Sequence, residues 1–276
     1  MKTLYISDLD GTLLSPDARL SEKTIEILNI LMEKGLLFSV ATARSIASVK
    51  ILLKDLKLSV PIILMNGVCI YDLQKREYLK VEYLSDRSRK TLLSLIAEHN
   101  LKGFAYTIRD GLLSTYYEEL SSKALHDFYQ ERVDLYQKRF HQIDHFTSLM
   151  DDALMYFTLL DQKETLEPIY HLLEMIPDLN CVMYKDNYTP DLWYLEVYSK
   201  NASKYHALQY LRSSVKPEQI VCFGDNRNDF PLFEGSDTKI AVGNAIDELK
   251  NKADFIIGKN NEDGVAVWLR DNGQVD

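Results

Sequence analysis

The sequence predicts an α/β protein with a parallel-sheet core domain and an inserted α+β domain. Short apolar runs alternate with helical patterns near both ends of the 276-residue chain, and this alternation is typical of a parallel sheet covered by helices. Hairpin signals replace it in the middle of the chain, and hairpins indicate antiparallel strands. We therefore expect a core domain from residues 1–82 and 193–276, and an inserted domain from residues 83–192.

The N-terminal part begins with a short β-branched and aromatic run, Thr3–Ser7, which predicts a buried strand. Ser21 can cap the helix that follows, because its side chain can accept a hydrogen bond from the first turn, and Gly35 ends it. The next expected elements are a strand at Leu36–Ala41, a helix from Ser45 and a strand at Val60–Met65.

The middle of the chain contains two hairpin patterns. Arg109–Asp110–Gly111 separates two apolar runs, and Asp-Gly is a strong hairpin signal. A second hairpin is expected from Cys181–Lys185 and Trp193–Tyr198. The other elements expected in the inserted domain are helices from Asp86, near Lys123–Gln137 and at Thr165–Met175, and a strand at Leu154–Leu160.

The core domain is expected to resume after the insertion. Its strands are predicted at Ile220–Phe223, Lys239–Val242 and Phe255–Ile257, and its helices at Lys204–Leu211 and Gly264–Arg270.

Composition excludes several classes of function. A formal charge of −9 with no basic stripe argues against nucleic-acid binding. No apolar run approaches the roughly 18 residues that span a bilayer, and two aspartates by residue 10 exclude a signal peptide. Cys69, Cys181 and Cys222 lie in apolar runs without a zinc-ligand pattern, so we expect buried thiols and a cytoplasmic location.

Two carboxylates follow the first predicted strand, at Asp8 and Asp10, and Gly11 comes next. Strand ends in a parallel sheet are where ligands collect. Carboxylates this close repel unless a cation neutralises them, and oxygen ligands suit Mg²⁺. Gly11 permits a turn that leaves backbone amides free to face an anion. A turn rich in Asp and Gly is the simpler alternative; an EF-hand is excluded, because Leu13 and Arg19 occupy its glycine and glutamate positions.

Further polar residues follow other predicted strands. Thr42 ends one strand, and Asp225 and Asp229 follow another. Because parallel strand ends lie side by side, these residues can gather with Asp8, and with one lysine they suit phosphoryl transfer. Taken singly, Thr42 could be an ordinary strand residue, the two aspartates turn and cap residues, and Lys204 a solvated charge.

Motifs spread along the whole chain support the same site. They are Asp8–Leu9–Asp10–Gly11–Thr12–Leu13–Leu14, Ala41–Thr42–Ala43–Arg44, Ser203–Lys204 and Gly224–Asp225–Asn226–Arg227–Asn228–Asp229, with further matches at Asn66–Gly67 and Ala241–Val242–Gly243–Asn244–Ala245. In these motifs the chain resembles a haloacid dehalogenase superfamily phosphatase of the Cof-type subfamily. The resemblance implies a Rossmann-like core domain with an inserted α+β cap domain. Ala43 and Tyr205 stand where that family usually has glycine.

The resemblance also implies catalytic roles. Asp8 would be the nucleophile that forms an aspartyl-phosphate, and Asp10 the general acid and base. We expect Asp10 to face water until substrate closes the site. Mg²⁺ would be bound by the Asp8 carboxylate, the Asp10 backbone carbonyl and Asp225, with Asp229 supporting it directly or through water.

Phosphate-binding roles follow from the same likeness. Thr42 and Lys204 would contact phosphate oxygens, and Asn228 matches a phosphate-contacting position of the family. Arg44 has two open interpretations, as a substrate contact or as a surface ion pair.

We therefore expect a Mg²⁺-dependent phosphatase of small-molecule phosphate esters, sugar phosphates first, which binds neither nucleic acid nor membrane. The cap would close over the site and select the leaving group. A sugar phosphomutase and a catalytically idle metabolite-binding protein are the alternatives.

Overall fold

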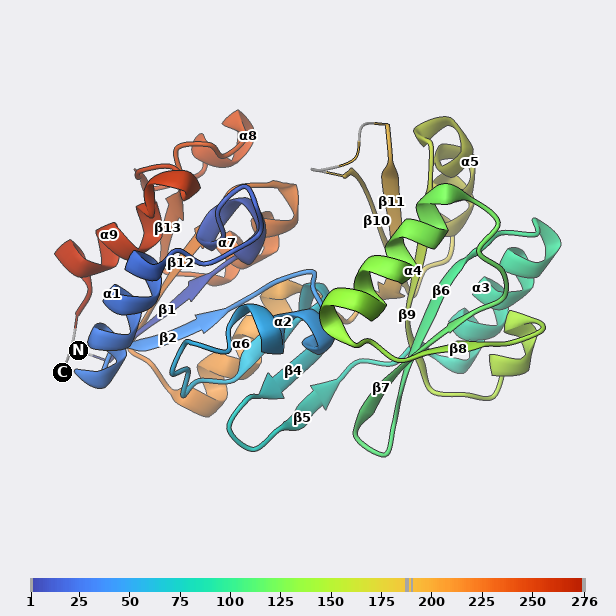
Figure 1. Ribbon diagram of the computed structural model, residues 1–276, viewed down its shortest axis with the longest axis horizontal. Coiled ribbons are helices and arrows are strands. Elements are labelled where there is room, and N and C mark those ends of the chain that lie inside the picture. Colours follow the sequence, from blue (N-terminus) through green and yellow to red (C-terminus); the bar gives the residue numbers. More distant parts are fainter. Residues whose placement is uncertain (1, 187–188, 190, 275–276) are drawn as a thin grey trace. The chain divides into compact units, whose positions relative to one another are not determined.

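The computed structural model describes residues 2–186, 189 and 191–274. The chain divides into two compact units, which we call the core unit (residues 1–80 and 203–276) and the inserted unit (residues 81–202). Figure 1 shows the elements of each unit. Among the described residues, no helix is long and apolar enough to cross a membrane.

The core unit is built on a parallel sheet of the order β14-β13-β12-β1-β2. Every pairing within this sheet is parallel, and all five residues of the interior strand β1 are buried. The carboxyl ends of its strands therefore lie along one edge. The strands are β1 (Thr3–Ser7), β2 (Leu37–Val40), β12 (Gln219–Gly224), β13 (Thr238–Ala241) and β14 (Phe255–Ile256).

The four helices predicted for the core unit form in the expected order, and two short helices that the sequence analysis did not predict lie between them. Ser21 caps the first one by accepting a hydrogen bond from the backbone N–H of Thr24, as expected. α1 packs beside α9, and α6 packs beside α7. The helices are α1 (Glu22–Glu33), α2 (Ile46–Leu52), α6 (Lys204–Val215), α7 (Phe230–Gly235), α8 (Asp247–Lys250) and α9 (Gly264–Asn272).

The strand predicted at Val60–Met65 was expected in the parallel sheet, but it lies in a small antiparallel sheet. β3 (Ile62–Leu64) pairs antiparallel with β4 (Cys69–Asp72), and β5 (Glu77–Val81) completes this small sheet. A single parallel bridge between Ala41 and Ile63 joins it to the end of β2. The chain reverses immediately after β3, so the strand has a local antiparallel partner that its apolar pattern did not indicate.

The inserted unit contains a second sheet of the order β10-β11-β9-β6-β7-β8. Its pairings are antiparallel except for β7 with β8, and both predicted hairpins form. The elements are α3 (Asp86–Glu98), β6 (Gly103–Arg109), β7 (Leu112–Tyr117), α4 (Lys123–Tyr136), β8 (Phe140–Gln142), β9 (Leu154–Asp161), α5 (Lys163–Glu174), β10 (Leu179–Lys185) and β11 (Trp193–Ser199).

The position of β11 corrects the expected domain boundary. The strand lies between β10 and β9, and it pairs with both of them. A strand in the interior of a sheet cannot belong to another domain, so the inserted unit ends at residue 202, where we expected residue 192. Cys181 of β10 is only partly buried, unlike the buried Cys69 and Cys222, which corrects our expectation for that thiol.

One face of the inserted sheet packs against α3 and α5. Leu92, Phe157 and Leu173 are fully buried in the resulting hydrophobic cluster. On the opposite face, Phe104 stacks on Phe128 of α4 with ring centroids 4.5 Å apart. The inserted unit therefore has a hydrophobic core of its own.

We expect Phe157→Ala to destabilise the inserted unit strongly. The side chain is 0% exposed in the cluster, and truncation of a buried Phe costs about 3–5 kcal/mol because it leaves a cavity. Urea denaturation followed by tryptophan fluorescence measures the loss. Leu112→Ala, at a side chain that is 51% exposed, serves as the control and should change the free energy of unfolding by about 0.5 kcal/mol or less. Equal effects of the two substitutions would contradict the assignment of this core.

Candidate active site

The site begins where the neighbouring strands β1 and β12 end. Ser7 lies opposite Phe223, and the backbone N–H of Asp8 donates to the carbonyl oxygen of Phe223 at 3.0 Å. Because the two strands are parallel and in this register, Asp8 and Asp225 leave the sheet at the same point although they lie far apart in the sequence.

The segment after Asp8 turns tightly over Asp225. Gly11 has a φ of +81°, and a Cβ at this position would lie 2.3 Å from the Asp225 Oδ2 atom. Only glycine permits both the left-handed backbone and this close approach. Thr12 then donates its hydroxyl hydrogen to Asp225 Oδ1 at 2.8 Å. The turn thus fixes the Asp225 carboxylate beside Asp8.

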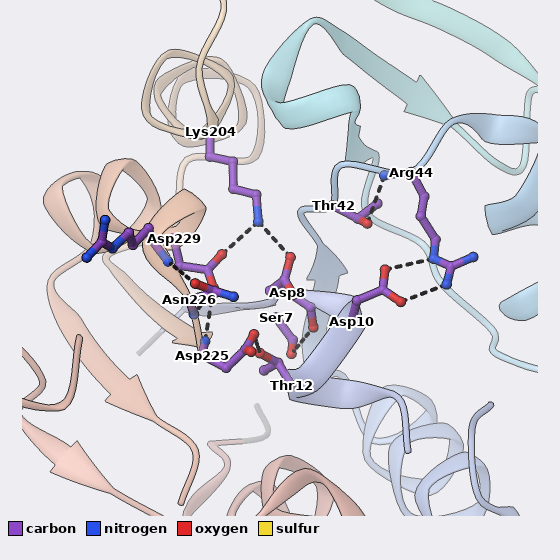
Figure 2. Close-up of polar contacts among 11 residues, drawn as sticks. Ser7, Asp8, Asp10, Thr12, Thr42, Arg44, Lys204, Asp225, Asn226 and Asp229 are labelled. Carbon is purple, nitrogen blue, oxygen red and sulfur yellow. Dashed lines mark hydrogen bonds and ion pairs between the residues drawn. The ribbon is translucent and has the colours of Figure 1, made fainter. Parts of the chain in front are cut away.

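Three carboxylates meet at this point, as Figure 2 shows. Asp8, Asp225 and Asp229 are buried, and each offers an oxygen within 4.8 Å of the others. Lys204 lies among them: its Nζ donates to Asp8 Oδ1 at 2.6 Å and to Asp229 Oδ1 at 2.7 Å. The structure thus brings together four residues that the sequence proposed for one site.

Asp229 is held from both sides. Its Oδ1 accepts from Lys204, and its Oδ2 accepts from the backbone N–H groups of Asp225 at 2.9 Å and Asn226 at 3.1 Å. The 3₁₀ turn Arg227–Asp229 makes this contact possible, because it brings Asp229 back to the end of β12. Asp229 therefore braces the site, while Asp8 keeps an oxygen, Oδ2, that no hydrogen bond engages among the described residues.

Burial and mutual repulsion raise the pKa values of Asp8 and Asp225. Burial raises the pKa of Asp8 well above its ordinary value; Lys204 opposes the shift, and Asp229 and Asp225 add to it. Burial and then the charge of Asp229 raise the pKa of Asp225 to about 7. Burial alone would lower the pKa of Lys204, but Asp229 and Asp8 reverse this and the net shift is upward.

The residues fit a small divalent cation. Three carboxylates face a single ammonium group, so the cluster lacks positive charge. Its side-chain donors are oxygens, which match the preference of Mg²⁺. A bound cation would remove the repulsion that raises the pKa of Asp8 and Asp225.

Asp10 does not face open water, contrary to our expectation. Arg44 binds both of its carboxylate oxygens, from Nε at 2.7 Å and from Nη2 at 2.7 Å. The two side chains are only 25% and 19% exposed (Figure 2). Arg44 therefore forms an ion pair, which was one of its two expected roles. The pair is partly buried rather than on the surface, and the carboxylate in it belongs to Asp10. The acidic partner lies 34 residues away, so no local pattern could have shown it.

Thr42 and Asn228 differ in how well they are placed. Thr42 is buried at the end of β2, and its hydroxyl oxygen accepts from the backbone N–H of Arg44 at 3.1 Å. Asn228 is half-buried on the 3₁₀ turn Arg227–Asp229. Within the described residues, no hydrogen bond joins the Asn228 side chain to the cluster.

Two residues of the site had no role in the sequence analysis. Thr12 orients Asp225, as described above. Asn244 donates from Nδ2 to the carbonyl oxygen of Gly11 at 2.7 Å, and its Oδ1 accepts from the backbone N–H of Asn260 at 2.9 Å. Both residues lie in motifs that we had matched, so the signal was present, but a hydrogen bond across more than 200 residues was not visible in it.

Fold and site together define an α/β protein with an acidic cluster at the ends of parallel strands. Residues 5–269 match the family described as haloacid dehalogenase-like hydrolases. The chain belongs to this family, as the resemblance implied, and it is therefore an enzyme of the hydrolase class.

Several known proteins are similar over almost their whole length. A 5-amino-6-(5-phospho-D-ribitylamino)uracil phosphatase of Bacillus subtilis is 28% identical, over 98% of this chain and 97% of the relative. A pyridoxal phosphate phosphatase of Escherichia coli is 26% identical, over 95% of each chain. A crystal structure of a Thermotoga maritima protein superposes with a TM-score of 0.81 at 26% identity, covering 100% of this chain and 99% of that one.

We expect Asp225→Asn to change how the stability of the chelator-treated protein depends on pH. With a pKa of about 7, folded Asp225 keeps a proton that the unfolded chain releases above about pH 4. The free energy of unfolding of the wild type, relative to Asp225→Asn, should therefore fall as the pH rises from about 4 to about 7. The slope is at most about 1.4 kcal/mol per pH unit.

Urea denaturation of both proteins across this pH range measures the difference. The exposed Asp55→Asn is the control for loss of a carboxylate. A difference that stays constant with pH would contradict the raised pKa of Asp225. Added Mg²⁺ should stabilise the wild type above pH 7 more than Asp225→Asn.

Proposed function

We propose that this hydrolase is a Mg²⁺-dependent phosphomonoesterase of small phosphorylated metabolites that acts through an aspartyl-phosphate on Asp8. The observation that carries the proposal is the position of Asp8: it is buried beside two further carboxylates, Lys204 engages one of its oxygens, and its other oxygen has no partner among the described residues. This geometry suits a carboxylate nucleophile that Lys204 and a bound cation would together keep ionised.

In the proposed reaction, an oxygen of Asp8 forms a bond to phosphorus and the bond from phosphorus to the ester oxygen breaks. Lys204 and Thr42 stabilise charge on the phosphoryl oxygens, and backbone amides around Gly11 and the side chain of Asn228 are further candidates for this role. A water molecule then attacks phosphorus and releases inorganic phosphate and free Asp8. Asp8, Asp225 and the Asp10 backbone carbonyl would hold Mg²⁺ with support from Asp229, and the cation would neutralise phosphoryl charge.

Asp10 is the proposed general acid and base. It gives a proton to the departing ester oxygen and later takes one from the attacking water. The two hydrogen bonds from Arg44 fix the orientation of its carboxylate. A protonated carboxyl can still accept hydrogen bonds, but Arg44 engages both oxygens of Asp10, so release of one bond would free an oxygen to turn its proton toward the ester oxygen. We propose that Arg44 positions Asp10 and gives up one bond when substrate arrives.

The names of the relatives support a small phosphate ester as the substrate. The Bacillus subtilis relative is named for a phosphorylated ribityl compound, and the Escherichia coli relative for pyridoxal phosphate. Both names denote a phosphate monoester of a small polar molecule. We propose a sugar or polyol phosphate as the substrate and assign selectivity between esters to the inserted unit.

We expect Asp8→Asn to abolish turnover of p-nitrophenyl phosphate in the presence of Mg²⁺, because an amide oxygen cannot form the covalent intermediate. A loss of at least about 10³-fold in kcat is anticipated, since no other group replaces the nucleophile. Release of inorganic phosphate measures it, and near-normal turnover by this variant would exclude Asp8 as the nucleophile. Asp55→Asn removes an exposed carboxylate and serves as the control.

We expect Arg44→Ala to affect poor leaving groups most. p-Nitrophenolate departs without a proton, whereas the alcohol of a sugar phosphate needs one from Asp10, and general acid catalysis contributes about 10²–10⁴-fold. The fall in kcat/KM should therefore be at least about tenfold greater for a hexose phosphate than for p-nitrophenyl phosphate. The control is Arg227→Ala, which removes an exposed arginine paired with Glu248. Equal losses on both substrates would show that Arg44 does not act through Asp10.

A further inference from the structure

A strained turn lies between two of the motifs that line the site. Met65, Asn66 and Gly67 have φ values of +51°, +54° and +98°, and all three residues are buried. L-residues visit this left-handed region singly as a rule, because the Cβ atom crowds the backbone. Consecutive left-handed residues persist only where their surroundings impose the conformation, and such strain is concentrated at functional sites.

One side of the turn holds the segment that carries Thr42 and Arg44. The backbone N–H of Met65 donates to the carbonyl oxygen of Arg44 at 3.1 Å. The backbone N–H of Asn66 donates to the carbonyl oxygen of Thr42 at 3.0 Å. The Met65 N–H follows extended Leu64, whereas the direction of the Asn66 N–H depends on the left-handed conformation of Met65. The turn therefore helps to set the position of this segment.

The other side of the turn touches the start of α6. A Cβ on Gly67 would lie 2.1 Å from the carbonyl oxygen of Ser203 and 2.8 Å from the backbone nitrogen of Lys204. Ser203 is also the N-cap of α6, since its hydroxyl oxygen accepts from the backbone N–H of His206 at 3.1 Å. Gly67 therefore lies in direct backbone contact with the residue that enters the acidic cluster.

We propose that the Met65–Gly67 turn is a positioning element that sets Lys204 relative to the Thr42–Arg44 segment. These two parts of the core unit lie on opposite sides of the inserted unit in the sequence, and the turn contacts the backbone of both. The inference rests on the proposed function, in which Lys204 and Thr42 contact the same phosphoryl group. The backbone of the turn, rather than a side chain that reaches the substrate, performs the role.

Gly67→Ala tests the proposal against a matched control. Gly111 also has a positive φ, of +72°, but a Cβ there would meet no atom within 4 Å. Both substitutions strain the backbone, and only Gly67→Ala pushes on the start of α6. Displacement of a catalytic group by about 1 Å can cost about 100-fold. We expect a loss of this order in kcat/KM for Gly67→Ala, and a change within about twofold for Gly111→Ala.

A double-mutant cycle with Lys204→Ala separates positioning from general destabilisation. If the Met65–Gly67 turn acts through Lys204, Gly67→Ala should cost no more than about twofold in the Lys204→Ala background, because coupled residues are not additive. Purely structural damage would give the full loss in both backgrounds and would overturn the proposal. Equal activity of Gly67→Ala and Gly111→Ala would overturn it as well.

A second pair of variants covers the case in which Gly67→Ala does not fold. Asn66→Gly keeps the left-handed region accessible, whereas Asn66→Ala makes it unfavourable, and neither adds bulk beside Ser203. We expect Asn66→Ala to lose more kcat/KM than Asn66→Gly, and equal losses would contradict a role for the backbone conformation. A wild-type protein that hydrolyses no phosphate ester would instead refute the proposed function itself.

Discussion

The confinement of three carboxylates beside one ammonium group is the constraint on which the rest of the site depends. Asp8, Asp225 and Asp229 are held together by the parallel pairing of β1 with β12 and by the 3₁₀ turn after β12. Such a cluster is unfavourable without compensation, because burial and repulsion both disfavour the charged form. Lys204 supplies part of the compensation, and the remaining deficit of positive charge fits a divalent cation.

The surrounding backbone maintains this arrangement by close contacts that leave no room for side chains. Gly11 lies against Asp225, and Gly67 lies against the start of α6. Hydrogen bonds then fix the groups at these contacts: Thr12 orients the Asp225 carboxylate, and Asn244 donates to the carbonyl oxygen of Gly11. Uncharged neighbours thus help Lys204 to set the acidic residues, which explains why a chemical motif alone does not make an active site.

The polar groups outside the acidic cluster show how one interaction can serve two purposes. The ion pair with Arg44 satisfies a partly buried Asp10 and fixes its orientation, but it also occupies the oxygens that the proposed proton transfer needs. In the proposed mechanism, release of one of these bonds would couple the arrival of substrate to the readiness of Asp10 as the acid.

The sequence by itself determined the parallel-sheet core, the two hairpins, the family and the residues of the acidic cluster, because each depends on local periodicity or on a short motif at a strand end. The tertiary structure alone decided that Arg44 pairs with Asp10, that β11 belongs to the inserted sheet and that Thr12 and Asn244 support the site. These contacts join residues that the sequence separates, by 34 residues for Arg44 and Asp10 and by 233 for Asn244 and Gly11. A local pattern shows which chemical group a residue offers, whereas the choice of its partner is made by packing, which brings distant segments to the same point.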